Sequence, residues 1–186
     1  SRIDYSNDNT IALTRGPLSN AVIGAAAAGD ENYGYFSGGH NGSSVLTDVD
    51  RINYANDTAD AVSKGPLTSA RYYHAGTSGI DCGYWGGGSP GPSYHSDIYR
   101  TAFSNDTATS TPKGTLSSSR TYLAAVSARI NGFDLLSDYP EGTYGSSNYG
   151  YFGGGSTLVT GLSAIDRIDY SNDTATAIEK GPLTHS

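Results

Sequence analysis

The sequence predicts an all-β protein built from repeated antiparallel units, and three observations support this. The first is a segment, RIDYSNDNTIALTRGPL at residues 2–18, whose near copies stand at 51–67, 100–116 and 167–183. The second is a glycine-rich motif, GYFSGG, GYWGGG or GYFGGG, at 34–39, 83–88 and 150–155. The third is composition: Gly, Ser, Thr, Asn and Tyr are abundant. Apolar residues do not recur at helical spacing, so short strands and tight turns are favoured.

The unit at residues 69–116 illustrates the expected elements. ARYYHAGTS predicts a first short strand and GIDCGYWGGG a second; after the loop SPGPSYHS, DIYRTAF predicts a third. SNDT predicts the next reversal, because Asn and Asp tolerate left-handed conformations and hydrogen-bond their own backbone in turns. ATSTPKG predicts a polar fourth strand. The first strands are rich in small residues, as at 25–28, which predicts a crowded position for them.

The spacing of the copies predicts how the units are arranged. Their opening arginines, Arg2, Arg51, Arg100 and Arg167, are 49, 49 and 67 residues apart, so the last unit carries 18 extra residues. A period near 50 residues is typical of four-stranded β-propeller blades. We therefore predict one propeller segment over 1–186. It comprises a half blade at 1–18, blades at 19–67 and 68–116, and a blade at 117–183 with an insertion at about 129–147. The chain is expected to begin in mid-blade.

The motifs also carry a family resemblance. A Tyr–Phe–Gly–Gly–Gly strand, a strand ending in an aromatic residue, a short Asn/Asp turn and a Pro–Leu exit together resemble the kelch repeat over essentially the whole chain. Kelch repeats usually place a tryptophan early in the fourth strand, where this chain has Ala12, Ala61, Ser110 or Ala177. RIDYSNDTATA with KGPL and GYFGGG is similar to a kelch-like repeat of structural proteins of marine bacteriophages. The resemblance implies a kelch-like β-propeller, with three complete blades plus the half blade, in a virion or extracellular protein.

Charge and hydropathy exclude several classes of partner. The formal net charge is −7 and the pI is near 4.8, with eleven scattered basic residues, which argues against binding nucleic acid. No apolar run approaches 18 residues, so no membrane span is expected. The single cysteine, Cys82, cannot form an internal disulfide and is predicted to be a small buried strand residue.

The sequence predicts no catalytic residue, metal site or cofactor. His40, His74, His95 and His185 make no HxH or HxxxH pair. Asp48 and Asp50, with Asp57 nearby, are the candidates for calcium, but they lack the ligand density of an EF-hand loop. SNDTAT lacks the Gly and Trp of a sialidase-type turn. Only closeness in sequence supports a Cys82–Tyr84 crosslink of the copper-oxidase kind. We therefore expect a protein that is not an enzyme.

The 18-residue insertion supplies the predicted binding site. It places aromatic rings beside carboxylates, a combination that stacks on sugars and hydrogen-bonds them, in Phe133, Asp134, Asp138, Tyr139, Glu141 and Tyr144. The alternative is that these aromatic rings pack the long loop onto its own blade. The insertion is expected beside the SNDT turns, whereas the loops HNGSSVLTD, SPGPSYHSD and STLVTGLSAID are expected together at the opposite face.

Four sequons complete the candidate positions: Asn41, Asn56, Asn105 and Asn172. They would be N-glycosylation sites only in a eukaryotic secreted protein, and three of them are the hairpin turn itself. The expected function is a structural and recognition module of a phage tail fibre or virion surface fibre. Its expected partners are other structural subunits, further blades of the same protein, or surface glycans. A bacterial cell-surface lectin or adhesin is the alternative, and a propeller enzyme is a weaker one.

Overall fold

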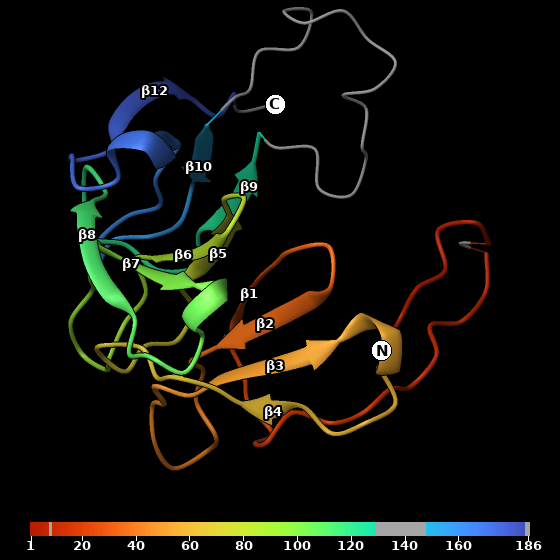
Figure 1. The fold of residues 1–186 in the computed structure, drawn as a ribbon. Coiled ribbons are helices and arrows are strands. Elements are labelled where there is room, and N and C mark those ends of the chain that lie inside the picture. Colours follow the sequence, from red (N-terminus) through yellow and green to blue (C-terminus); the bar gives the residue numbers. More distant parts are fainter. Residues whose placement is uncertain (8, 129–147, 185–186) are drawn as a thin grey trace, which may run out of the picture.

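The computed structural model describes residues 1–7, 9–128 and 148–184, and it is an all-β structure with three four-stranded antiparallel sheets (Figure 1). This confirms the predicted all-β class and the predicted four-stranded antiparallel units. Each sheet is a meander in which neighbouring strands follow one another along the chain. One sheet falls in each of the ranges 19–67, 68–116 and 117–183.

The strands are short, as the turn-rich sequence predicts. The first sheet contains β1 (Ala26–Gly29), β2 (Tyr33–Ser37), β3 (Val49–Asn53) and β4 (Val62–Ser63). The second contains β5 (Ala75–Ser78), β6 (Cys82–Gly86), β7 (Asp97–Ala102) and β8 (Thr111–Thr115). The third contains β9 (Ala124–Ser127), β10 (Tyr149–Gly153), β11 (Ala164–Asp169) and β12 (Ile178–Pro182).

The predicted Asn/Asp reversals join the third and fourth strand of each sheet. Each begins with one turn of 3-10 helix: η1 (Tyr54–Asn56), η2 (Phe103–Asn105) or η4 (Tyr170–Asn172). Asn53 caps the first of these, since its Oδ1 accepts a hydrogen bond from the amide of Ala55 at 2.9 Å. Asp169 caps η4 in the same way through the amide of Ser171 at 2.9 Å, whereas η2 follows Ala102 and has no side-chain cap.

The first strands of the three sheets lie side by side, with β5 between β1 and β9 (Figure 1). Their small residues are required, because a Cβ atom on Gly76 would lie 2.3 Å from the carbonyl oxygen of Ala27. Ser78 links all three strands: its Oγ accepts from the amide of Gly29 at 2.8 Å, and its carbonyl accepts from Ser127 Oγ at 2.7 Å. The predicted crowding at the first strands is therefore present.

Two hydrophobic clusters fill the spaces between neighbouring sheets. Trp85 of β6 is fully buried against the first sheet, with Ala26, Tyr35, Val49, Leu67 and Tyr99 in the same cluster. Its indole N–H donates to Thr101 Oγ1 at 3.0 Å, so the buried polar atom is satisfied. Phe152 of β10 occupies the equivalent position between the second and third sheets. The aromatic residues of the second and third glycine-rich motifs thus pack their sheets onto the preceding ones.

An aspartate in the reversal also ties each sheet to the preceding repeat. Asp106 accepts hydrogen bonds from Tyr35 Oη at 3.0 Å and Arg51 Nη1 at 2.7 Å, and Lys64 Nζ lies 3.3 Å away. Burial and then Asp106 raise the pKa of Tyr35 above its usual value, so this hydroxyl stays a donor. We call this arrangement a junction.

The junction recurs with the same residue types. Asp173 accepts from Tyr84 Oη at 3.0 Å and Arg100 Nη1 at 2.8 Å, and Lys113 Nζ lies 3.1 Å away. Asp57 makes the first junction with Arg2 at 3.0 Å and Arg15 at 3.1 Å. In each SNDT or ANDT turn, the junction aspartate is the third residue.

Residues 2–18 differ from the predicted half blade in their local structure. The sequence predicts two strands here, but the structure has a single isolated bridge between Arg2 and Leu13. A lone two-stranded ribbon is marginal in water because it has no further strand to pair with. This segment is held to the first sheet mainly at the Asp57 junction and by backbone bonds such as Gly16 N to Asp57 O, at 2.9 Å.

Candidate functional site

The predicted site in the insertion lies outside the described residues. Phe133, Asp134, Asp138, Tyr139, Glu141 and Tyr144 all fall in 129–147. The described residue that follows this range, Asn148, accepts a hydrogen bond from the amide of Tyr170 at 2.7 Å. Asn148 therefore lies beside η4, at the end of the sheets that carries the Asn/Asp reversals.

The four sequon asparagines lie on exposed turns. Asn56, Asn105 and Asn172 each end the 3-10 turn of a reversal, and their side chains are exposed. Asn41 is in the loop after β2, where its Oδ1 accepts from the amides of Ser43 at 3.0 Å and Ser44 at 2.9 Å. Turn geometry accounts for all four positions.

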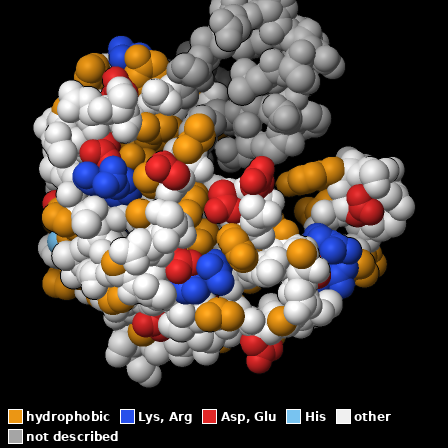
Figure 2. All heavy atoms as spheres, in the orientation of Figure 1, with side chains coloured by type: hydrophobic (Ala, Val, Ile, Leu, Met, Phe, Trp, Pro, Cys, Tyr) orange, Lys and Arg blue, Asp and Glu red, His pale blue; other side chains and the backbone are white. Residues whose placement is uncertain are grey.

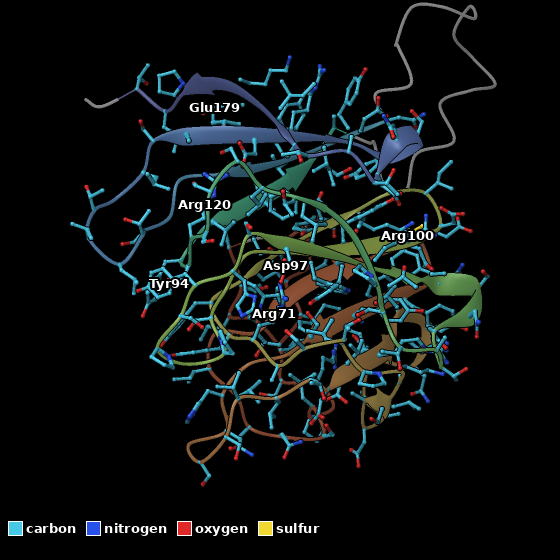
Figure 3. The ribbon with its side chains drawn as sticks, turned by 90° about the vertical axis from the view of Figure 1, so that its left-hand side faces the viewer. Arg71, Tyr94, Asp97, Arg100, Arg120 and Glu179 are labelled. Atoms are coloured by element: carbon cyan, nitrogen blue, oxygen red, sulfur yellow. The ribbon has the colours of Figure 1, made fainter. Side chains whose placement is uncertain are left out.

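The loops between second and third strands gather at the opposite end of the sheets. Figure 3 shows Tyr94, from the loop of the second sheet, at one end and Arg100, which leads to the reversal, at the other. At the loop end, backbone bridges pair Tyr72 with Ser89 and Thr121 with Ser156. The residues just before β5 and β9 are therefore hydrogen-bonded to the loop that follows the second strand of the same sheet.

Three tyrosine side chains form a continuous aromatic surface at this end. The ring of Tyr73 lies 4.1 Å from that of Tyr122 in a stacked arrangement and 4.5 Å from that of Tyr72. His40 extends the row, with its ring 5.8 Å from that of Tyr72. We call Tyr72, Tyr73 and Tyr122 the tyrosine platform. Tyr122 is 62% exposed and Tyr72 and Tyr73 are partly buried, so Tyr122 presents the main solvent-exposed ring.

The backbone beneath the platform is strained. Tyr73 has φ 53° and Tyr122 has φ 57°, the left-handed region that side chains with a Cβ avoid. The aligned residue of the first repeat is Gly24, with φ 68°, which occupies this region without cost. The amide of Tyr73 donates to Gly24 O at 2.7 Å and that of Tyr122 to Tyr73 O at 2.9 Å. This chain of bonds holds the conformation, at a cost of about 1–2 kcal/mol for each tyrosine.

Polar groups border the platform. Partial desolvation, and then the neighbouring Tyr73, Tyr72 and Tyr94, raise the pKa of Tyr122, so its hydroxyl remains protonated. Nδ1 of His40 accepts from the amide of Gly42 at 2.9 Å, which places the proton of the neutral ring on Nε2. His95 pairs through Nδ1 with Asp97 at 2.9 Å. The site therefore combines flat aromatic rings with hydroxyl and imidazole groups at its edge.

This arrangement suits a neutral, flat ligand that presents C–H groups. The face of a tyrosine ring carries the negative part of its quadrupole and attracts polarised C–H bonds, which a pyranose ring offers. Hydroxyl and imidazole groups at the edge supply hydrogen bonds that fix orientation. The platform was not predicted from sequence. The signal for it was the alignment of VIGAAAA, YYHAG and TYLAA, in which tyrosine twice replaces the glycine that the backbone requires.

A hollow of about 280 Å³ lies at the reversal end, between the Gly79–Cys82 turn and Tyr170. Two groups in its wall, Arg100 and Tyr84, are engaged by Asp173. Cys82 is buried, as predicted, and burial raises its pKa to about 12. Its thiol donates to Asp81 Oδ1 at 3.0 Å and is a poor nucleophile in this state.

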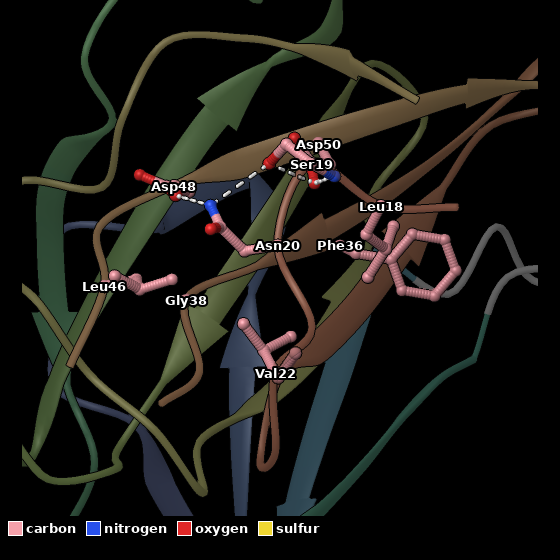
Figure 4. A pocket seen from close by; sticks show the side chains of 10 residues that line it. Leu18, Ser19, Asn20, Val22, Phe36, Gly38, Leu46, Asp48 and Asp50 are labelled. Carbon is pink, nitrogen blue, oxygen red and sulfur yellow. Dashed lines mark hydrogen bonds between the residues drawn. The ribbon is translucent and has the colours of Figure 1, made fainter. Parts of the chain in front are cut away.

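A second, much smaller pocket of about 10 Å³ lies in the first sheet (Figure 4) and contains Asp48 and Asp50. Asn20 Nδ2 donates to Asp48 at 2.9 Å, and Ser19 N and Oγ donate to Asp50 Oδ2 at 2.7 and 2.8 Å. Asp57, the third residue considered for calcium, is instead engaged by Arg2 and Arg15 at the first junction. Within 1–7, 9–128 and 148–184, no three His, Cys, Asp or Glu side chains form a group that could hold a metal.

On the face drawn in Figure 2, basic and acidic side chains alternate in small groups. No helix in the described part of the chain has the length and apolar character needed to cross a membrane. No protein-family model matches this chain, and no curated protein matches its sequence.

Proposed function

We propose that this chain is a non-enzymatic structural and recognition module in which the three sheets are successive blades of a kelch-like β-propeller. A propeller gathers the first strands of all blades around one axis, and β1, β5 and β9 lie side by side here. The junctions at Asp106 and Asp173 repeat the same link between consecutive sheets. Rigid attachment of each sheet to the next is what a scaffold that displays loops requires.

The recognition part of the proposal is carried by the tyrosine platform. Tyr73 and Tyr122 occupy a backbone conformation that the first repeat gives to glycine, and their rings are stacked at a solvent-exposed surface. Strained residues of this kind cluster at ligand sites, where the surrounding structure holds them in place. We propose a surface glycan as the ligand, bound through neutral sugar rings that stack on Tyr122. The net charge of −7 disfavours acidic sugars such as sialic acid.

The proposal that this chain is not an enzyme rests on the surroundings of its ionisable and nucleophilic side chains. The junction aspartates are neutralised by Arg and Lys, and the Cys82 thiol is held protonated. His74 is fully buried with its pKa lowered to about 3. These groups therefore serve packing and strand attachment, and the platform offers stacking and hydrogen bonding.

The setting follows from the sequence resemblance. We propose that the module belongs to a phage tail fibre or another virion surface fibre, outside the cell, with a host glycan as the ligand. The same platform would serve a bacterial surface lectin or adhesin. Electron microscopy of purified virions labelled with antibody against this chain distinguishes the two: labelled fibres support the virion assignment, and unlabelled virions with labelled bacterial surfaces support the adhesin.

Glycan-array binding tests the recognition proposal. We expect the wild-type chain to bind arrays of neutral hexose glycans, Tyr122→Ala to lose at least tenfold in affinity, and Tyr122→Phe to retain most of it because stacking survives. Tyr54→Ala, at the reversal end, is the matched aromatic control and should bind as wild type. Loss of binding in Tyr139→Ala/Tyr144→Ala with no effect of Tyr122→Ala would move the site to the insertion and overturn the platform assignment.

A further inference from the structure

The loop between β2 and β3 carries an asparagine followed by a glycine, Asn41–Gly42, and both residues are exposed. An asparagine side chain reacts with its own backbone when the nitrogen of the next residue attacks Cγ and closes a five-membered succinimide ring. Glycine in the next position favours this reaction because it has no Cβ to crowd the ring. A Cβ atom on Gly42 would meet nothing within 4 Å, so the space around this nitrogen is open. The aligned loops of the second and third sheets contain no asparagine.

A base lies against the nitrogen that would attack. The amide of Gly42 donates a hydrogen bond to Nδ1 of His40 at 2.9 Å, so the lone pair of the neutral imidazole points at the proton that must be removed. A group within hydrogen-bond reach of such a proton is placed to act as a general base. The backbone of His40 is fixed by a reciprocal pair of bonds with Ile23, each of 3.0 Å. The base is therefore held in position by the fold.

The carbonyl that would be attacked is held by two donors. Oδ1 of Asn41 accepts hydrogen bonds from the amides of Ser43 at 3.0 Å and Ser44 at 2.9 Å. Negative charge gathers on this oxygen when Cγ becomes tetrahedral, and paired backbone amides stabilise such charge as an oxyanion hole does. The bond from Asn41 N to Ser44 O, at 3.2 Å, closes the same turn. The turn thus polarises the side-chain amide as well as orienting it.

A second asparagine of the first sheet shows what is special about this loop. Asn53 Oδ1 also accepts a backbone hydrogen bond, from Ala55 at 2.9 Å. The residue after it is Tyr54, whose amide donates to the carbonyl oxygen of Asn32 at 3.0 Å. That nitrogen therefore faces a peptide oxygen, which is not a base, and it belongs to a residue with a bulky side chain. Asn53 is thus an internal reference for the reactivity of Asn41.

We propose that Asn41 is a site of self-catalysed deamidation, with His40 as the general base. His40 Nδ1 takes the proton of the Gly42 amide while the nitrogen forms a bond to Asn41 Cγ. The bond from Cγ to the side-chain nitrogen then breaks, and His40 returns the proton to this nitrogen, which leaves as ammonia. Water, the one co-reactant, opens the ring at either carbonyl and leaves aspartate or isoaspartate. The net change is the loss of ammonia and the gain of water.

The product alters the edge of the tyrosine platform. One negative charge appears beside His40, whose ring lies 5.8 Å from that of Tyr72. Where the ring opens to isoaspartate, one methylene group is also added to the backbone of the loop. The chemistry at Asn41 needs only this loop and water, so it holds whether or not the platform binds a glycan.

Peptide mapping of the whole chain by tandem mass spectrometry tests the proposal. Samples are kept at neutral pH and taken over time, either folded in sodium chloride or unfolded in guanidinium chloride of equal ionic strength. We expect Asn41 in the folded chain to lose its amide at least about tenfold faster than in the unfolded chain, because only the fold supplies the base and the two donors. Asn53, read in the same samples, should show no acceleration on folding.

Two histidine variants identify the base. His40→Gln keeps a hydrogen-bond acceptor at this position but cannot take a proton, so Asn41 in the folded variant should react no faster than in the unfolded chain. The fluorescence of the single tryptophan, Trp85, verifies that the variant is folded. His95→Gln, in the loop of the second sheet, is the matched control and should react as wild type. A folded wild-type chain that reacts no faster than the unfolded chain, or a His40→Gln chain with the wild-type rate, overturns the proposal.

Discussion

His74 Nε2 lies 2.8 Å from Ser37 Oγ, and this buried hydrogen bond joins the entrance of β5 to the end of β2 in the preceding sheet. The imidazole ring also meets the indole of Trp85 edge-on, with centroids 6.4 Å apart. Burial first, and then the positive charge of Arg71, lower the pKa of His74 to about 3. A neutral histidine is therefore part of the contact between the first and second sheets.

Acid should weaken this contact through His74. Between pH 6.5 and about 3 the unfolded chain binds a proton at this histidine and the folded chain does not, so the free energy of unfolding falls as pH decreases through that window. One such proton contributes a slope of about 1.4 kcal/mol per pH unit. Urea unfolding followed by Trp85 fluorescence at pH 7 and pH 5 measures it. His74→Gln should have a flatter pH profile than wild type, and equal slopes would show that His74 is not the responsible group.

The Asp106 junction should contribute measurably to stability. Asp106→Ala leaves Tyr35 Oη, Arg51 and Lys64 without their shared acceptor, so the free energy of unfolding should fall by about 2–3 kcal/mol. Asp60→Ala, on an exposed part of the following loop, is the matched control and should change it by less than about 0.5 kcal/mol. A double-mutant cycle with Arg51→Ala should show coupling; additive effects would indicate that the ion pair contributes nothing.

The small pocket of Figure 4 exists because the first repeat lacks an arginine. The residues aligned with Val22 are Arg71 and Arg120, and Arg120 pairs with the fully buried Asp166. Asp50 aligns with Asp166, is 5% exposed, and its Oδ1 has no partner among the described residues.

Val22→Arg combined with Asn20→Ser should restore the pair seen in the third sheet. We expect the free energy of unfolding to rise by about 1 kcal/mol, because the buried Asp50 carboxylate gains a charged partner, as Asp166 has in Arg120. Thermal and urea unfolding measure the change. Asn20→Ser/Val22→Met fills space without charge and should not give this gain; if it stabilises equally, the effect is one of packing alone.

The elements that were predictable from sequence are those set by local chemistry. The Asn/Asp reversals and the strands before and after the GYWGGG-type motif lie where turn residues and alternation place them. The first strands are crowded, as their small residues predict. Residues 2–18 form less regular structure than predicted, because strand pairing there depends on a neighbour that the sequence pattern does not show.

The sites that were missed depend on contacts between repeats. Asp106 was interpreted only as a turn residue, although Arg, Lys and Asp recur together in the copies and their co-occurrence indicates the junction. The tyrosine platform depends on a left-handed backbone at Tyr73 and Tyr122, which is fixed by bonds from one repeat to the next. Neither feature follows from the periodicity of a single repeat.

The Tyr122→Gly variant tests the central claim, that the platform is a binding surface held under backbone strain. Glycine suits φ 57°, so this variant should unfold at the same free energy as wild type or up to about 1 kcal/mol higher. Calorimetric titration with a neutral glycan identified on the array should show at least a tenfold loss of affinity in the same variant. A destabilised Tyr122→Gly chain that binds the glycan with wild-type affinity would contradict the account, because Tyr122 would then serve packing and not recognition.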